Sequence, residues 1–287
     1  MPLTKLYAQP VASQPHEPYT TAPEVARPLL LCEVREHSPE IQHLLTQFLL
    51  PVELMVGFGI DPITWRNRQG KMMVHVAWAE DGHVWGLRLL NDIDPRDPLI
   101  EFEMADTVFG RITITWIEVN DPRAPRFDTD VMPDGRNTLR GTACRHLEAE
   151  IAAMLAGLAP GQVRRGLGLV SQLLDDVEQF MAALQHHEYE VEPLYYHNAI
   201  LFERYGFQYV RGQALMERIH AGFAPDGDLT QRLDGSSPFR RPELAGTIRG
   251  RSWAIHDGIL DEPWEHVKMI KRIGVRAGLD TAPGIPF

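Results

Sequence analysis

The sequence predicts an α+β protein in which helices and strands pack in layers. Its clearest local signal is a β-hairpin in "KMMVHVAWAEDGHVWGLRLLND" (71–92), where two strand-like runs flank an Asp-Gly turn. Two more strand-like runs follow, over 99–106 and 111–121. Between 166 and 184, apolar residues recur at the three- and four-residue spacing of an amphipathic helix. A run of strands followed by a helical region is typical of the α+β class.

Ahead of the hairpin, the sequence predicts a strand over 27–36 and a helix over 38–50. Ser38 is the expected N-cap of this helix, with Pro39 in its first position. Residues 1–27 contain prolines and small polar residues but no apolar run, so we expect a flexible arm rather than a secretion signal.

The second half of the chain begins with a stretch, 120–140, that is dense in Pro, Asp, Gly and Arg and is expected to form a long loop. The alanines of 147–160 favour a helix by local propensity, although the short length before Pro160 also permits a buried strand. Further on, the pattern predicts a strand over 187–193, a helix from Asn198 to Gly206 and two strands within 207–219. The C-terminal part, 221–287, is expected to contain a docking helix over 264–273.

Composition narrows the class of protein. Of the 287 residues, 44% are hydrophobic, which is enough to bury a substantial core. The formal net charge of −11 argues against nucleic acid as a partner and mildly favours a cationic or amine substrate. No window of 18 apolar residues indicates a membrane span, and two cysteines do not make a disulfide framework. We therefore expect a cytoplasmic protein that does not bind membranes.

The segment "GQVRRGLGLV" (161–170) has the features of an anion site. Glycines allow the backbone to approach a ligand closely, and the first N–H groups of the helix that follows are unpaired and carry the positive end of its dipole. Arg164 and Arg165 add positive charge. Together these features suit a diphosphate. The segment is neither a Walker A loop, since GxxxxGK[ST] is absent, nor a complete dinucleotide fingerprint, since Ser171 stands where a third glycine belongs.

This segment and "NAILFERYGF" (198–207), forty residues downstream, resemble the two motifs of the GNAT superfamily of acyl-CoA-dependent N-acyltransferases. The resemblance covers about 28–220. It implies a GNAT-like fold: a mixed, mostly antiparallel central sheet flanked by helices in a three-layer arrangement, with an inserted strand and loop region at about 94–146. It makes 221–287 an extension that packs on the domain or on a partner subunit, as in a homodimer.

The resemblance also overrides the helix propensity near 150. It implies that 150–159 form a buried strand facing the acyl group of acetyl-CoA, the co-substrate, and that backbone amides from about Val163 to Val170 hold the diphosphate. The motif fits with either Gly166 or Gly168 as its first glycine, and we prefer Gly168. The implied acetyl-CoA-binding residues are Gly157, Leu158, Val163, Arg164, Arg165, Gly166, Leu167, Gly168, Leu169, Val170, Asn198 and Phe202.

An amine must lose a proton before it attacks a thioester, so the site needs a general base. Some family members use a glutamate at the start of the acyl-CoA strand, which corresponds here to Glu150 with Glu148 beside it. Phe202 occupies the position where the family often has the tyrosine that protonates the departing thiolate. Tyr196 and its neighbour Tyr195 are substitutes for that acid. Further candidate bases are Glu190, Glu192 and His197.

These features lead to an N-acetyltransferase that acts on a small-molecule or peptide primary amine, without a metal. Two alternatives remain open: a non-catalytic acyl-CoA sensor, favoured by Phe202 at the acid position, and a decarboxylase or hydrolase of acyl-CoA on the same fold.

Overall fold

The computed structural model describes residues 27–141 and 143–287, so most of the arm predicted over 1–27 lies outside the described residues. Within them, a seven-stranded sheet has the order β1-β2-β3-β4-β5-β7-β6. Every neighbouring pair is antiparallel except β4 and β5, which are parallel. The strands are β1 (Val74–Trp78), β2 (Val84–Leu89), β3 (Ile100–Asp106), β4 (Ile112–Val119), β5 (Glu188–Val191), β6 (Gln208–Arg211) and β7 (Lys268–Arg272).

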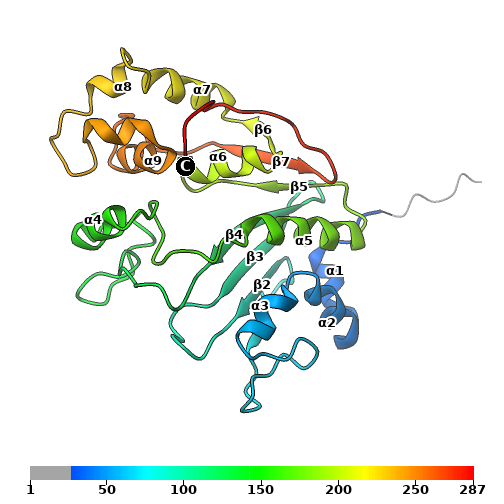
Figure 1. Cartoon of the computed structure of the whole chain (residues 1–287). Coiled ribbons are helices and arrows are strands. Elements are labelled where there is room, and N and C mark those ends of the chain that lie inside the picture. Colours follow the sequence, from blue (N-terminus) through cyan, green and yellow to red (C-terminus); the bar gives the residue numbers. More distant parts are fainter. Residues whose placement is uncertain (1–26, 142) are drawn as a thin grey trace, which may run out of the picture.

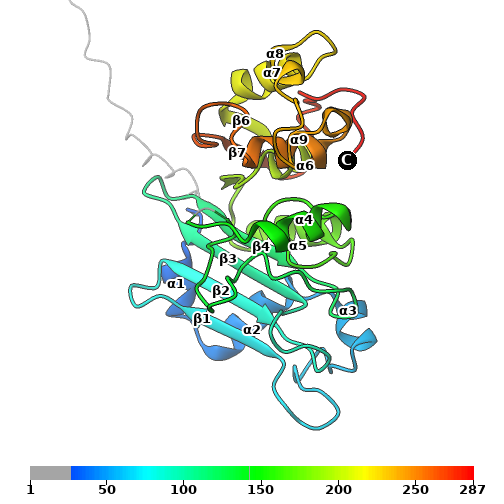
Figure 2. The same cartoon turned by 90° about the vertical axis from the view of Figure 1, so that its left-hand side faces the viewer.

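Helices cover one face of the β1–β4 half of the sheet. Figure 1 shows α5 (Val170–Ala183) lying across β3 and β4, and Figure 2 views the sheet from its other face, with α1 (Leu31–Arg35), α2 (Pro39–Gln47) and α3 (Val52–Gly57) behind the strands. Alternate residues of β2 explain this arrangement. Trp85, Leu87 and Leu89 are buried in the main core, and the Trp85 ring stacks on Phe180 of α5.

The other end of the sheet carries the later helices. These are α6 (Tyr196–Arg204), α7 (Gln213–Gly222), α8 (Asp228–Gln231), the 3-10 helix η1 (Pro242–Gly246) and α9 (Ile248–His256), which packs against α6. A separate helix, α4 (Leu147–Leu155), lies in the long connection between β4 and α5. It shares a small second core with the C-terminal part, formed by Ala153, Leu158, Phe239 and Trp253.

Several predicted elements are confirmed. The hairpin of β1 and β2 turns at Gly82, whose φ of 77° is a conformation that glycine adopts readily. The strands β3, β4 and β5 and the helices α2 and α5 also lie where the pattern placed them. Ser38 is the N-cap of α2 by position, although its side chain makes no capping hydrogen bond. The helix predicted from Asn198 begins two residues earlier, at Tyr196, and Gly206 follows its C-cap with a φ of 88°.

Three predicted elements were wrong. Residues 27–36 contain the short helix α1 rather than a strand, because Asp106 at the end of β3 accepts hydrogen bonds from the N–H groups that open this helix. Only the first of the two strands predicted in 207–219 exists, since Gly212 adopts a φ of 101° and helix α7 begins directly after it. The docking helix predicted over 264–273 is instead the strand β7.

β7 sits inside the sheet, hydrogen-bonded to β5 on one side and β6 on the other. Its three-residue apolar spacing suggested a helix, but pairing on both edges satisfies the backbone as a strand. The C-terminal part therefore supplies an inner strand of the sheet whose other six strands come from residues 28–220.

Among the described residues, no helix combines the length and the apolar character needed to cross a membrane.

Candidate ligand-binding cavity

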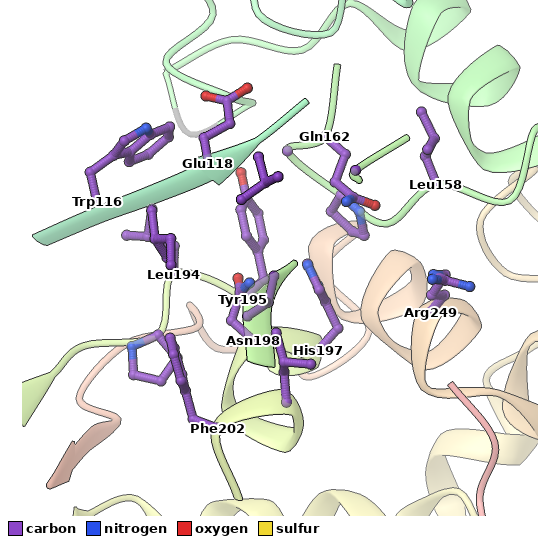
Figure 3. A pocket seen from close by; sticks show the side chains of 18 of the residues that line it. Trp116, Glu118, Leu158, Gln162, Leu194, Tyr195, His197, Asn198, Phe202 and Arg249 are labelled. Atoms are coloured by element: carbon purple, nitrogen blue, oxygen red, sulfur yellow. The ribbon is translucent and has the colours of Figure 1, made fainter. Parts of the chain in front are cut away.

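A cavity of about 770 Å³ opens between β4 and the segment that follows β5. Four parts of the chain line it: the second half of β4, the loop from 156 to 170, residues 191–205, and Arg249 with Phe287 from the C-terminal part. Figure 3 shows side chains from these parts arranged around a common space. Its volume is within the range that holds small molecules and cofactors.

The cavity exists because two parallel strands separate. β4 and β5 pair only through Thr113 with Glu190 and Ile114 with Val191. Directly after this point, a register shift between β3 and β4 leaves Thr115 as an extra residue, because Glu103 faces Trp116 while Met104 faces Ile114. Beyond Ile114, β4 has no strand partner on its β5 side among the described residues, and Thr115 to Asn120 line the cavity.

The loop before α5 offers a row of unpaired backbone donors. Within the described part of the chain, no N–H group from Val163 to Gln172 donates to a backbone or side-chain acceptor. Gly166 lies so close to β4 that a Cβ there would be 3.0 Å from the Val119 carbonyl oxygen. Gly168 has a φ of 75° and only open space where a side chain would be. These N–H groups lead into the N-terminus of α5, so the row is suited to an anion.

The two arginines of this loop have different environments. The guanidinium of Arg164 is buried and pairs with Asp94 and with Asp97, at 2.6 Å from Nε to the latter's Oδ2, so its charge is already neutralised. Arg165 is exposed and, among the described residues, forms no ion pair. Arg249, at the start of α9, also forms no ion pair among the described residues. Its guanidinium lies over the Phe287 ring.

Arg165 and Arg249 place two uncompensated positive charges at this cavity. Partial desolvation and then the positive charge of Arg165 lower the pKa of the Arg249 guanidinium, which shows that the two charges repel each other. A negatively charged ligand between them would relieve that repulsion. The row of N–H groups, the start of α5 and this pair therefore favour the same kind of ligand, a phosphate or diphosphate.

The start of α6 contributes three polar side chains, Tyr195, His197 and Asn198, which Figure 3 shows rising toward β4. The Tyr195 hydroxyl donates to the Arg140 carbonyl at 2.5 Å, and burial raises the pKa of this phenol. His197 Nδ1 lies 2.9 Å from the Ser252 hydroxyl of α9. Burial, followed by the charges of Arg249 and His256, lowers the pKa of His197 to about 3, so the imidazole is neutral at physiological pH.

Glu118, near the end of β4, is an acidic residue of the cavity wall that is largely buried and hydrogen-bonded. Its carboxylate accepts from Arg140 Nη2 at 2.7 Å and from Asn120 Nδ2 at 3.2 Å. Burial raises the pKa of Glu118 above that of an ordinary glutamate, and the Arg140 charge opposes this only in part. A carboxylate with a raised pKa is better matched to general-base chemistry near neutral pH than an exposed one.

Arg140 holds this side of the cavity together. It pairs with Glu118, lies over the Trp116 ring, donates to the Gly161 carbonyl and accepts from Tyr195. Its backbone has a φ of 57°, a conformation that costs energy for a residue with a side chain. The contacts to β4 and to the start of α6 compensate this cost.

Most of the residues predicted to bind the cofactor lie at the cavity, whereas the predicted catalytic residues Glu148, Glu150 and Tyr196 do not line it. Val163 is buried beside the loop, and Leu169 packs against the core at the start of α5. Tyr196 is buried with its ring against Trp264. Three of the further acid and base candidates line the cavity: Glu192, Tyr195 and His197. The predicted cofactor-binding residues that line it are Gly157, Leu158, Arg164, Arg165, Gly166, Leu167, Gly168, Val170, Asn198 and Phe202.

The strand predicted over 150–159 was wrong. These residues form the second half of α4 and the turn after it, where the Gly157 φ of 81° ends the helix. The alanine-rich sequence satisfies its own hydrogen bonds as a helix, as its local propensity indicates. The expected insertion, 94–146, contains both β3 and β4, which are central strands of the sheet, and β4 is the strand that borders the cavity.

Glu148 and Glu150 therefore lie on a helix and are not among the residues that line the cavity. Glu150 is buried, with Oε2 at 2.8 Å from Arg145 Nε and Oε1 at 3.2 Å from His256 Nε2. Burial alone would raise the pKa of Glu150, but the hydrogen bonds from His256 and Arg145 more than offset it and lower the pKa. These contacts join α4 to α9.

We expect Glu150→Gln to lower the free energy of unfolding by about 2 kcal/mol, because a charge-assisted pair with Arg145 is lost inside the protein. Since the folded-state pKa of Glu150 is lowered, this contribution is present at neutral pH and disappears as the pH falls through that pKa. Urea unfolding of both proteins at neutral and acidic pH measures the difference. Equal stability at neutral pH would contradict it.

Sequence reasoning did not find Glu118, Arg140 or Arg249. A signal for Glu118 was present, since 111–121 read as a strand and alternation places Trp116, Glu118 and Asn120 on one face. Arg140 and Arg249 come from connections far from the motifs along the chain, and no local pattern marks them.

Comparison of the chain with models of protein families, with curated proteins and with solved structures finds no match.

Proposed function

We propose that this protein is an acyl-CoA-dependent N-acyltransferase that transfers an acetyl group from acetyl-CoA to a primary amine. The observation that carries the proposal is the row of unpaired N–H groups from Val163 to Gln172, which leads into α5 at the cavity and is flanked by Arg165 and Arg249. A diphosphate satisfies both the donors and the two charges.

The shape of the cavity supports the same ligand. A diphosphate at the loop before α5 directs the rest of coenzyme A into the space between β4 and the segment after β5. There the free edge of β4 offers backbone N–H groups to a thioester carbonyl, which develops negative charge as it is attacked. The likeness to the GNAT motifs predicted a strand that faces the acyl group, and in this proposal β4 takes that role in place of 150–159.

In the proposed reaction, Glu118 is the general base. The amine nitrogen attacks the thioester carbon and forms the C–N bond, and the carboxylate of Glu118 takes the proton that the nitrogen loses. The C–S bond then breaks and coenzyme A leaves as its thiolate. Tyr195, which burial keeps protonated, is the hydroxyl that can donate a hydrogen bond to the sulfur once it turns from the Arg140 carbonyl.

The test has two stages, binding and turnover. Calorimetry is expected to show acetyl-CoA binding to the full chain, and thiol release is expected only when an amine from a panel of small amines, polyamines and peptides is added. Failure to bind acetyl-CoA overturns the proposal. Binding without thiol release under any amine identifies a sensor, and thiol release without amine identifies a hydrolase.

A further inference from the structure

A second cluster of metal-ligating side chains lies where α1 meets the β1–β2 turn and the end of β3. Cys32 belongs to α1, His83 follows the hairpin turn between β1 and β2, and Asp106 ends β3. One donor atom from each of them lies within 4.8 Å of the other two. None of the three lines the cavity described above.

Asp106 is the centre of this cluster. Its side chain is 3% exposed, and Oδ1 accepts from Leu31 N at 2.8 Å while Oδ2 accepts from Cys32 N at 3.1 Å. His83 Nδ1 lies 3.0 Å from the same Oδ2. Within the described residues, no lysine or arginine pairs with this carboxylate. Two backbone N–H groups and His83 contact this carboxylate, but no permanent cation balances its buried negative charge, so a cation is the ligand that the cluster favours.

We propose that Cys32, His83 and Asp106 bind one Zn²⁺ ion, with water completing its coordination. Thiolate, imidazole and carboxylate are the three ligand types that zinc takes in proteins. The sulfur argues against Mg²⁺ and Ca²⁺, which prefer oxygen. Cys32 is a free, half-buried thiol, and the His83 side chain is 50% exposed, which gives the ion a path from solvent.

The geometry requires only a small movement. Tetrahedral zinc with bonds of about 2.0–2.3 Å places its ligand atoms about 3.3–3.8 Å apart. The three donor atoms lie within 4.8 Å of one another, so the widest separation closes by at most about 1–1.5 Å. The 3.0 Å between His83 Nδ1 and Asp106 Oδ2 opens slightly. The ion takes the place of the contact between His83 Nδ1 and Asp106 Oδ2. His83 binds through Nδ1 as the neutral imidazole with its proton on Nε2, and the Cys32 thiol releases its proton to solvent. Because the three ligands come from separate elements, the bound ion ties α1 to the hairpin and to β3 and therefore stabilises the folded chain.

Titration of the reduced, chelator-treated full chain tests this site. We expect one Zn²⁺ per chain by calorimetry and, with Co²⁺ as a spectroscopic substitute, an absorption band from thiolate ligation. Cys32→Ser is expected to remove that band and to weaken Zn²⁺ binding at least tenfold, and His83→Ala to weaken it similarly. Zn²⁺ is expected to raise the Tm of the unsubstituted protein but not that of Cys32→Ser.

Two matched variants serve as controls: Cys144→Ser, which changes the other half-buried thiol, and His187→Ala, which changes an exposed histidine elsewhere. Both are expected to bind Zn²⁺ as the unsubstituted protein does. The proposal is wrong if the unsubstituted chain binds no Zn²⁺, if the thiolate band persists in Cys32→Ser, or if it disappears in Cys144→Ser.

Discussion

Replacing Arg165 and Arg249 together by glutamate is expected to weaken acetyl-CoA binding at least about a hundredfold. Each of these arginines is available for a charge-assisted hydrogen bond to phosphate, worth about 1.5–3 kcal/mol, and every 1.4 kcal/mol is about tenfold in affinity. The substituted carboxylates also repel the ligand. Since neither arginine forms an ion pair within the described chain, the free energy of unfolding is expected to change little. Calorimetry and urea unfolding measure the two effects separately.

The matched control changes the net charge by the same amount elsewhere. Arg68 and Arg136 are both exposed and do not line the cavity. Their double replacement by glutamate is expected to leave the acetyl-CoA Kd within a fewfold of its original value. Equal affinities of the two double variants would mean that the cavity does not hold the diphosphate. Added salt is expected to narrow the difference between them, because it screens exposed charges.

Glu118→Gln is expected to lower kcat by about 10²–10⁴-fold while leaving the Kd of acetyl-CoA almost unchanged, since a positioned general base contributes about that much. The amide keeps the size of the side chain and can still accept from Arg140. Burial raises the pKa of the Glu118 carboxyl, and the proposed reaction needs this carboxyl ionised. As the pH is lowered, activity is therefore expected to fall at a higher pH than it would with an ordinary glutamate as the base. Stopped assays of kcat/KM against pH, with the same substrates for both proteins, measure this.

Glu192 is the matched control for this substitution. It also lines the cavity, but its side chain is 64% exposed and its nearest cation is Lys268, at 3.7 Å. Glu192→Gln is expected to keep nearly full kcat and an unchanged pH profile. If Glu192→Gln loses turnover and Glu118→Gln does not, the base is Glu192 and the assignment to β4 is wrong.

The stability of Glu118→Gln at neutral pH is expected to be at least that of the unsubstituted protein, since ionising a buried carboxyl with a raised pKa opposes folding.

The sequence predicted elements well where the signal is local. The Asp-Gly turn of the β1–β2 hairpin and the apolar stripe of α5 depend on neighbouring residues, and both elements formed as expected. The apolar spacing over 264–273 is equally regular but misleading, because β5 and β6 on either side decide its conformation as a strand. For 150–159, local propensity indicated a helix, and the likeness to a distant motif was the wrong guide.

The candidate site was predicted in the same uneven way. The glycine-containing loop was found because its residues are contiguous and its backbone requirement is visible in the sequence. Arg164 was expected to serve the ligand, but Asp94 and Asp97, which neutralise it, lie far back along the chain. Arg249 approaches the loop only because α9 packs on α6. Such contacts depend on how distant segments fold together, and no spacing rule contains them.

The position of β7 also sets an order of events during synthesis. In the described part of the chain, β6 lies at the edge of the sheet and pairs with β7 alone. Yet β6 ends at Arg211 and β7 begins at Lys268, 57 residues later (268 − 211). While the ribosome is still translating that interval, β6 has no neighbour and β5 exposes the edge that β7 will cover. Until β7 has emerged, the nascent chain thus exposes one edge of β5 and one edge of β6 in addition to the edges that stay open in the finished sheet, and such exposed edges favour aggregation.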